Sequence, residues 1–183
     1  MENASESTIK GTGVVAGVAY AEAVWVRPRP ALPTEGSIDP EQASDSEYDR
    51  FLAAVDTVAG RLEQRAAAAE GQAAEVLTAT AGMVKDRGWH KAVRKNIRTG
   101  RNAEFATVGA TDKFVTMFEA AGGVMAERTT DLKDVRDRVI AELRGEDEPG
   151  LPLVDGEAVL FADDLAPADT AILYTCDAAV GRS

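Results

Sequence analysis

The chain has 183 residues, of which 45% are hydrophobic and 28% charged, a composition that supports a packed core in one or two domains. Its net charge of −11 argues against nucleic-acid binding, and no apolar run approaches the roughly 18 residues of a membrane span. The single cysteine, Cys176, and the single histidine, His90, exclude an intrachain disulfide and multi-histidine or cysteine-rich metal sites. We expect a cytoplasmic protein, since the first residues also lack the apolar stretch of a signal peptide.

The first forty residues predict a strand and then an extended loop. β-branched and small apolar residues over Val18–Val26 favour a strand. Repeated prolines over Arg27–Pro40 favour an extended chain. This loop leads into a helix start, because Asp39 can cap, Pro40 suits the first helical position and Gln42 suits a capping box.

Residues 40–145 predict helices joined by short turns, because apolar residues recur at spacings of three and four. The expected helices span about Pro40–Ala69, Gln72–Val84, Trp89–Arg98, Asn102–Ala121 and Val124–Arg144, with Asn102 as a cap. The apolar faces expected to be buried are Tyr48, Phe51, Leu52, Val55, Val58 and Leu62; Val76, Leu77, Thr80 and Met83; Phe105, Val108, Phe114, Val115 and Phe118; and Leu132, Val135, Val139 and Leu143. Such helices should pack as an antiparallel bundle.

The last part of the chain is acidic and predicts a second strand. Nine acidic side chains and only one basic residue, Arg182, follow residue 145, and Gly145–Gly150 is typical of a linker. Ala158–Ala162 favours a strand, and a helix is expected from Pro167. Because each strand alone is too short for a stable sheet, we expect the two ends of the chain to pair. The predicted fold is α+β: a small α/β domain from residues 1–30 and 150–183, interrupted by an inserted helical bundle at residues 38–145.

His90 is the one side chain that composition offers as a general base or phosphate acceptor. No neighbouring acid is placed to orient it, with Asp86 the nearest candidate, so an exposed helix residue is the favoured interpretation. It lies in a basic run, Lys85–Arg101, whose role the sequence does not identify. Four of these cations share one helix face, for which a solvated face is favoured over an anion or acidic-partner site. They are Lys91, Arg94, Lys95 and Arg98.

Three further groups fit structural roles at least as well as chemical ones. The glycines of Gly11–Gly17 lack the lysine of a phosphate loop and the dinucleotide spacing, so turns are favoured. Cys176 has no histidine or lysine beside it to stabilise a thiolate. A divalent ion could bind Asp163, Asp164 and Asp169, but a turn and a helix start explain them equally well. Residue spacing therefore names no reaction and no metal site.

Three separated segments carry a family resemblance. Ile9–Ala19 contains a glycine-bearing strand and a turn similar to Pro-Gly-Ile-Ala, with Ala16 in place of the proline. Ala126–Asp137 resembles an E-R-x-x-D-x-x-D-V-x-D signature, and Val159–Ala171 resembles a strand followed by A-x-D-L-x-P-[SA]-[ED]-T. Together they resemble the amino-terminal region of enzyme I, the phosphoenolpyruvate–protein phosphotransferase of the bacterial sugar phosphotransferase system.

The resemblance implies a fold and an activity. In the family, a swivelling phosphohistidine α/β domain is interrupted by a helical domain that binds the phosphocarrier protein HPr. The whole enzyme passes phosphoryl from phosphoenolpyruvate through a histidine to HPr in sugar uptake, uses magnesium and is dimeric. Here the family's G-G-x-T-S-H acceptor motif is not matched by Gly181-Arg182-Ser183. We therefore expect the acceptor histidine beyond Ser183, and this chain to be inactive alone, without a cofactor, monomeric and able only to dock HPr.

The resemblance also implies which residues dock the partner. The family's docking face comes from the first two helices of the insert and the arginine of the signature. The matching positions are Gly71, Gln72, Glu75, Met83, Val84 and Arg128. We expect an apolar contact centred on Met83 and Val84 with a polar ring around it, although bundle core is an equal interpretation of both residues.

Two other functions remain open from the sequence. One is a paralogous phosphotransferase module, either nitrogen-related or the phosphoryl donor of a dihydroxyacetone kinase. The other is a non-catalytic helical module that binds a partner. The sequence does not give sugar specificity, and it does not say whether Ser183 is a boundary of a cloned piece or of a natural truncation.

Overall fold

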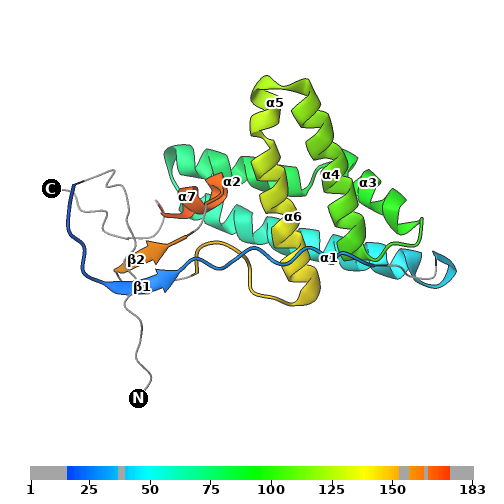
Figure 1. Ribbon diagram of the computed structural model, residues 1–183, viewed down its shortest axis with the longest axis horizontal. Coiled ribbons are helices and arrows are strands. Elements are labelled where there is room, and N and C mark those ends of the chain that lie inside the picture. The colour runs from blue at the N-terminus through cyan, green and yellow to red at the C-terminus, as the bar shows by residue number, and fades with distance from the viewer. Residues whose placement is uncertain (1–15, 37–39, 153–156, 163–164, 174–183) are drawn as a thin grey trace, which may run out of the picture.

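The computed structural model describes residues 16–36, 40–152, 157–162 and 165–173, and it is mostly helical with one two-stranded sheet (Figure 1). This confirms the predicted α+β fold. The elements are β1 (Glu22–Trp25), α1 (Pro40–Ala68), α2 (Gly71–Val84), α3 (Arg87–Ile97), α4 (Ala103–Ala121), α5 (Gly123–Glu127), α6 (Thr129–Arg144), β2 (Ala158–Phe161) and α7 (Pro167–Leu173). The strands and α7 fall in the ranges predicted for the α/β domain, and α1 to α6 fall in the helical range. The domain boundaries themselves stay predictions.

The helix ends follow local side-chain chemistry. The Asn102 side chain accepts a hydrogen bond from Phe105 N at 2.9 Å, so the predicted cap of α4 is confirmed. Asp86 caps α3 in the same way, accepting from Trp89 N at 2.7 Å. At the end of α6, Gly145 has φ +65°, a left-handed conformation that glycine adopts without strain.

The predicted single helix Val124–Arg144 is wrong in one respect, because it is divided at Arg128 into α5 and α6. Arg128 N donates to Met125 O, three residues back, at 3.2 Å, and Thr129 Oγ1 donates to Ala126 O at 2.8 Å. These three-residue hydrogen bonds tighten the turn and interrupt the α-helical pattern. The break leaves the Arg128 side chain exposed at a corner of the molecule.

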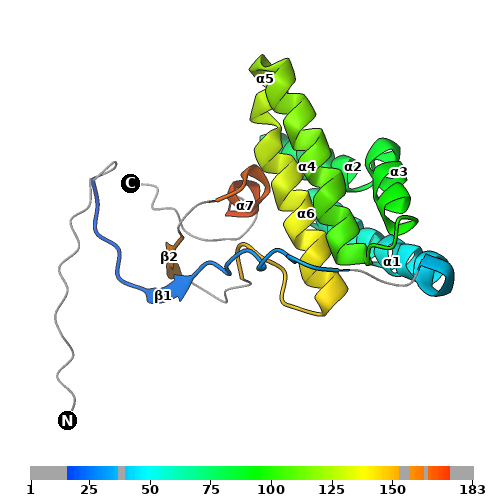
Figure 2. The same cartoon turned by 45° about the vertical axis from the view of Figure 1, so that its right-hand side comes forward.

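The core lies where two helical hairpins cross. In Figures 1 and 2, α1 and α2 form one hairpin, and α4 rises to α5 before α6 returns antiparallel to it. The apolar faces predicted for α1 and α6 are largely buried between these hairpins. The central buried residues are Phe51, Val55, Val58, Leu62, Leu77, Val135 and Val139.

The buried face of α4 matches the prediction only in part, since Val108 and Val115 are buried as expected. Phe105, Phe114 and Phe118 are only half-buried, whereas small residues form the inner face. Small side chains let helices approach closely, and the hydroxyl groups of Thr107 and Thr111 donate to the carbonyl oxygens four residues earlier, at 2.7 and 2.9 Å. The inner residues are Ala103, Ala106, Thr107, Ala110 and Thr111.

The two ends of the chain pair with each other, as predicted. Strand β1 runs parallel to β2, with Val24 opposite Leu160 and Trp25 opposite Phe161, and each strand is shorter than its predicted range. The rings of Trp25 and Phe161 lie 5.4 Å apart, yet they are 70% and 43% exposed. This sheet therefore presents an aromatic pair on its surface.

A buried arginine connects the helices to the C-terminal part. Arg138 of α6 is 1% exposed, and its Nε donates to Asp134 at 2.8 Å while its Nη2 donates to Asp169 of α7 at 2.7 Å. Its Nη1 donates to Glu148, which also accepts two hydrogen bonds of 2.8 Å from Arg65 of α1. We call these five side chains the Arg138 network. It joins α1, α6, the loop after α6 and α7.

Charge and burial compete in this network. Burial alone would lower the pKa of Arg138, but Asp134, Asp169 and Glu148 outweigh it, and the pKa is raised. For Glu148, burial alone would raise the pKa. Hydrogen bonds and charge from Arg65 and Arg138 outweigh that effect and hold the pKa of Glu148 below the usual value of 4.5. Both side chains are therefore ionised in the folded protein at neutral pH.

The segment between β1 and α1 runs along the helical part as an extended strap of residues 26–36 (Figures 1 and 2). Arg27 exchanges two backbone hydrogen bonds with Gly150, at 2.9 and 3.1 Å, and Arg144 donates to Ala31 O at 2.6 Å. Gly150 has φ +95°, and a Cβ there would collide with the Asp169 carboxylate. The strap thus meets the Arg138 network at a position that accepts only glycine.

We expect Arg138→Leu to destabilise the fold by on the order of 3–5 kcal/mol, because it leaves buried carboxylates without their cation. Urea unfolding followed by circular dichroism measures this loss. The matched control is Arg61→Leu, which removes the partly exposed 2.7 Å pair with Glu142. The control should lose less than about 1 kcal/mol. Equal losses in the two variants would show that the network does not stabilise the fold in this way.

A second test uses Glu148, whose folded-state pKa lies below its unfolded value. Its stabilising contribution is complete above the unfolded pKa of 4.5 and is lost as pH falls through the lower folded pKa. The variant Glu148→Gln should therefore be less stable than the parent at pH 6, with the difference shrinking in acid. Urea midpoints between about pH 6 and 3 measure it. A constant difference would contradict the assignment.

Candidate functional site

Three hollows follow one another along the exposed side of α2, and we call them together the α2 groove. The α7 hollow, of about 620 Å³, lies between α2 and α7. The middle hollow, of about 300 Å³, shares Gln72, Val76 and Pro167 with it. The α4 hollow, of about 340 Å³, shares Ala79, Met83 and Arg128 with the middle one. The shared residues make the groove continuous from α7 to α4.

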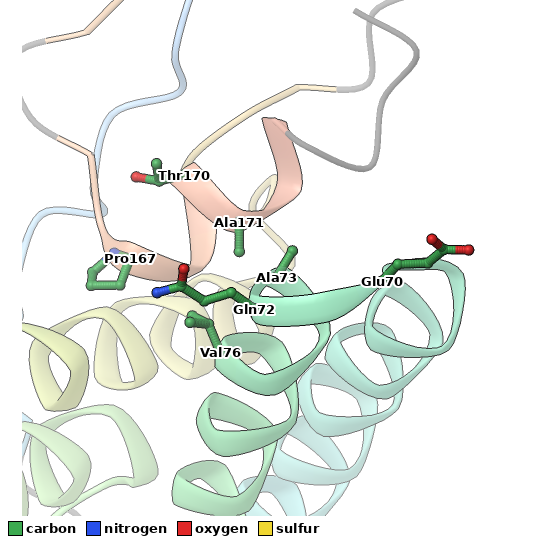
Figure 3. A pocket seen from close by; sticks show the side chains of 7 residues that line it. All are labelled: Glu70, Gln72, Ala73, Val76, Pro167, Thr170 and Ala171. Carbon is green, nitrogen blue, oxygen red and sulfur yellow. The ribbon is translucent and has the colours of Figure 1, made fainter.

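The α7 hollow has small and apolar walls with polar groups at its mouth. Figure 3 shows Gln72 directed toward Pro167, Ala73 close to Ala171, and the Glu70 carboxylate turned away. Asp169 positions the α7 wall, because its carboxylate is held by Arg138 and also accepts from Ala166 N at 3.2 Å. The Arg138 network therefore fixes one side of the groove.

The middle hollow contains the groove's charged groups. Arg128 is exposed between α5 and α6, and Asp131 follows three residues later, in the first turn of α6. Burial raises the pKa of Asp131 above its usual value, and the charge of Arg128 partly offsets this. With Glu75 on α2, the hollow presents two carboxylates around one guanidinium.

The α4 hollow is mainly apolar. Met83, Met125 and Leu132 surround the rings of Phe114 and Phe118, whose centroids lie 6.3 Å apart in a T-shaped pair. Methionine side chains adapt their shape to a partner, and aromatic rings supply much of the energy of protein interfaces. Asp86 and Arg128 lie at its edge. An apolar floor with a polar rim is the arrangement of a protein-docking surface.

The structure brings together four of the six predicted docking residues. Gln72, Glu75, Met83 and Arg128 line the α2 groove, and Met83 and Arg128 line the same two hollows. Gly71, at the start of α2, is exposed beside the groove without lining it. Their role in docking stays a prediction.

The prediction that Val84 contacts a partner is wrong for its side chain, which is 0% exposed in the core. Met83 lines two of the hollows, whereas Val84 lines none of the three. Phe114, Phe118, Met125 and Pro167 line the groove but were not predicted to do so. The spacing of four between Phe114 and Phe118 is a detectable sequence signal, since it places both rings on one face of the helix. From sequence alone, that face is predicted to lie in the core.

His90 occupies a different environment from the one predicted. It is half-buried rather than exposed: its Nε2 lies 2.8 Å from Val84 O, and its ring contacts Phe51 edge-on at 5.3 Å. The Asp86 carboxylate does not orient it, because that side chain caps α3. His90 therefore packs at the edge of the core and does not line the groove.

The other candidate residues either have a structural role or lie outside the described residues. Asp169 is buried in the Arg138 network, where its role is structural. Gly11, Cys176 and the pair Asp163 and Asp164 lie outside the described residues. In the described ranges no three His, Cys, Asp or Glu side chains lie close enough together to hold a metal ion. Among the same residues, no helix is long and apolar enough to cross a membrane.

Comparisons with known proteins place this architecture. Residues 10–128 match the family described as PEP-utilising enzyme, N-terminal. A phosphoenolpyruvate-protein phosphotransferase of Streptomyces coelicolor is 39% identical over 168 residues, which are 92% of this chain and 30% of that protein. The protein of the same name from Bacillus subtilis is 32% identical over 168 residues, covering 90% of this chain and 30% of the relative. The chain thus spans less than a third of the length of these relatives.

Solved structures support the fold. An NMR solution structure of an Enzyme I protein superposes with a TM-score of 0.69 at 23% identity, covering 83% of this chain and 63% of that one. A structure described as the N-terminal domain of Enzyme 1 – Nitrogen superposes with a TM-score of 0.62 at 21% identity, covering 85% and 65%. Both show a fold in common with this chain.

Cysteine labelling distinguishes Met83, which lines the groove, from its buried neighbour Val84. In a chain carrying Cys176→Ser, Met83→Cys should react with a thiol reagent at least about tenfold faster than Val84→Cys, which only local opening exposes. Mass spectrometry over time measures both rates in the folded protein. Equal rates would mean that Val84 is not enclosed in the core.

Proposed function

The chain belongs to the family of PEP-utilising enzymes, as their N-terminal domain, and we propose that its α2 groove docks the small phosphocarrier protein HPr. The relatives' name, phosphoenolpyruvate-protein phosphotransferase, describes enzymes that phosphorylate a protein, so a protein partner must bind them. The observation that supports the proposal most directly is the continuous groove that contains Gln72, Glu75, Met83 and Arg128 together.

The groove can provide both parts of a docking interaction. Its apolar end, around Met83 and Phe118, loses contact with water when a partner covers it, which favours binding. Its charged middle, with Glu75, Arg128 and Asp131, sets the partner's orientation through electrostatic complementarity. The carboxylates of Glu75, Asp86 and Asp131 along the groove attract a basic partner.

The whole protein would use this docking for phosphoryl transfer. We propose that it passes phosphoryl from phosphoenolpyruvate through a histidine to HPr in sugar uptake, in the cytoplasm and as a dimer. The described residues of this chain contribute the docking surface, and His90 is not the acceptor in this scheme. Among the described residues, no group of three His, Cys, Asp or Glu side chains is placed to hold the magnesium ion. Transfer depends on holding the two proteins in a productive orientation, which the groove supplies.

Binding experiments separate this function from the alternatives. HPr of the sugar system should bind the chain more tightly than the nitrogen-related carrier, since the names of these relatives carry no nitrogen label, unlike that of the second solved structure. Tighter binding of the nitrogen-related carrier would favour that paralogue. Binding of neither carrier would favour a non-catalytic interaction module.

We expect Arg128→Glu to weaken HPr binding by about tenfold or more without unfolding the chain, because Arg128 is exposed, lines both the middle and the α4 hollow, and loses its guanidinium donors to the partner in this variant. Isothermal titration calorimetry measures the affinity, and circular dichroism checks the fold. Lys113→Glu, an exposed residue on α4 that lines none of the three hollows, makes the same charge change and should bind like the parent. Unchanged affinity for Arg128→Glu would contradict docking in the groove.

A further inference from the structure

Helix α3 presents a row of exposed cations that we call the basic stripe. Its members are spaced by three, four and seven residues, which places them within about 100° of arc on one side of the helix. All are exposed. The opposite side of α3 is buried through Trp89, Val93 and Ile97. The stripe consists of Arg87, Lys91, Arg94, Lys95 and Arg98.

The stripe is electrostatically uncompensated within the described part of the chain. None of its five residues forms an ion pair there, and Arg94 instead lies over the Tyr48 ring at 4.8 Å. Several cations elsewhere are paired, among them Arg50, Arg61 and Arg65. In a chain with 31 acidic and 20 basic residues, five unpaired cations on one helix face are a local reversal of charge.

Helix stability explains only part of this arrangement, because Arg94 and Lys95 lie in the last turn of α3, where the helix dipole favours cations. Three like-charged pairs stand at a spacing of four: Arg87 with Lys91, Lys91 with Lys95, and Arg94 with Arg98. Each pair disfavours the helix by about 0.2–0.5 kcal/mol. Arg87 also stands at the positive end of the helix dipole. These costs are offset when a negatively charged partner covers the stripe.

The surroundings favour an acidic protein segment as that partner. No exposed aromatic residue interrupts the stripe, so it lacks the stacking platform of a single-stranded nucleic-acid site. The apolar side of α3 is enclosed in the bundle and cannot insert into a lipid surface. The stripe is also only one 11-residue helix long, and the net charge of −11 repels an extended polyanion beyond it.

We propose that the basic stripe of α3 is a second docking surface, which binds a short acidic protein segment of length similar to the helix. None of its residues lines the α2 groove, so this surface is separate from the one proposed for HPr. The guanidinium groups of Arg87, Arg94 and Arg98 are suited to bidentate pairing with carboxylates.

The test measures binding of a fluorescein-labelled oligoglutamate peptide of about ten residues, a length matched to α3. Fluorescence anisotropy should show binding to the 183-residue chain at about 50 mM salt that weakens strongly by about 300 mM. The triple variant Lys91→Glu, Lys95→Glu, Arg98→Glu should lose at least about tenfold in affinity at low salt. The matching triple with glutamine should lose less, because it removes charge without adding repulsion.

Controls separate the stripe from the chain's general charge. Lys113→Glu, a single exposed charge reversal on α4, should bind the peptide like the parent, whereas Lys91→Glu should bind it more weakly. The proposal is overturned if the peptide does not bind at low salt, if the glutamate triple keeps the parent's affinity, or if Lys113→Glu loses as much as Lys91→Glu. Tighter binding of single-stranded DNA or of phosphatidylserine vesicles than of the peptide would also overturn it, by indicating another class of partner.

Discussion

The placement of a single guanidinium in the protein interior is the constraint on which much of this structure depends. Removing a guanidinium from water costs on the order of several kcal/mol. This cost is recovered only when carboxylates surround the guanidinium in good geometry. Arg138 obtains those carboxylates from its own helix, from the loop after it and from α7. The charged group can therefore be buried only when these separate segments are assembled in one arrangement.

This requirement extends to the surface. Helix α7 has seven residues and is too short to hold its place by itself, so Asp169 and the small residues around it determine where it lies. Because α7 forms one wall of the groove, the interior ion pairs position residues that a partner would contact, such as Pro167 and Thr170. The Enzyme I structure that superposes on this chain shares its fold. In this chain, the signature segment Ala126–Asp137 contains both the exposed Arg128 and the buried Asp134.

The sequence was informative where local rules decide the outcome. The cap at Asn102 and the apolar face of α1 follow from capping chemistry and spacing. The pairing of the two ends is remote in sequence, but each strand is too short to be stable without a partner, and that need predicted it. The sequence was misleading where distant residues decide. Arg138 has Asp134 four residues earlier, a usable signal, but its partner Asp169 is remote in sequence, and charged side chains normally indicate a solvated face. The same limitation affected Phe114 and Phe118, whose exposure depends on how α5 and α6 fold back.

The parallel pairing of β1 with β2 has a consequence for the order of folding. Val24 and Leu160 meet only after the chain between them has closed a very long loop, and the entropy lost in closing it is large compared with what two four-residue strands gain. The helical hairpins, whose contacts are close in sequence, form without that penalty. Once formed, they bring the two ends within reach of each other, so we expect the sheet to assemble last and to open first.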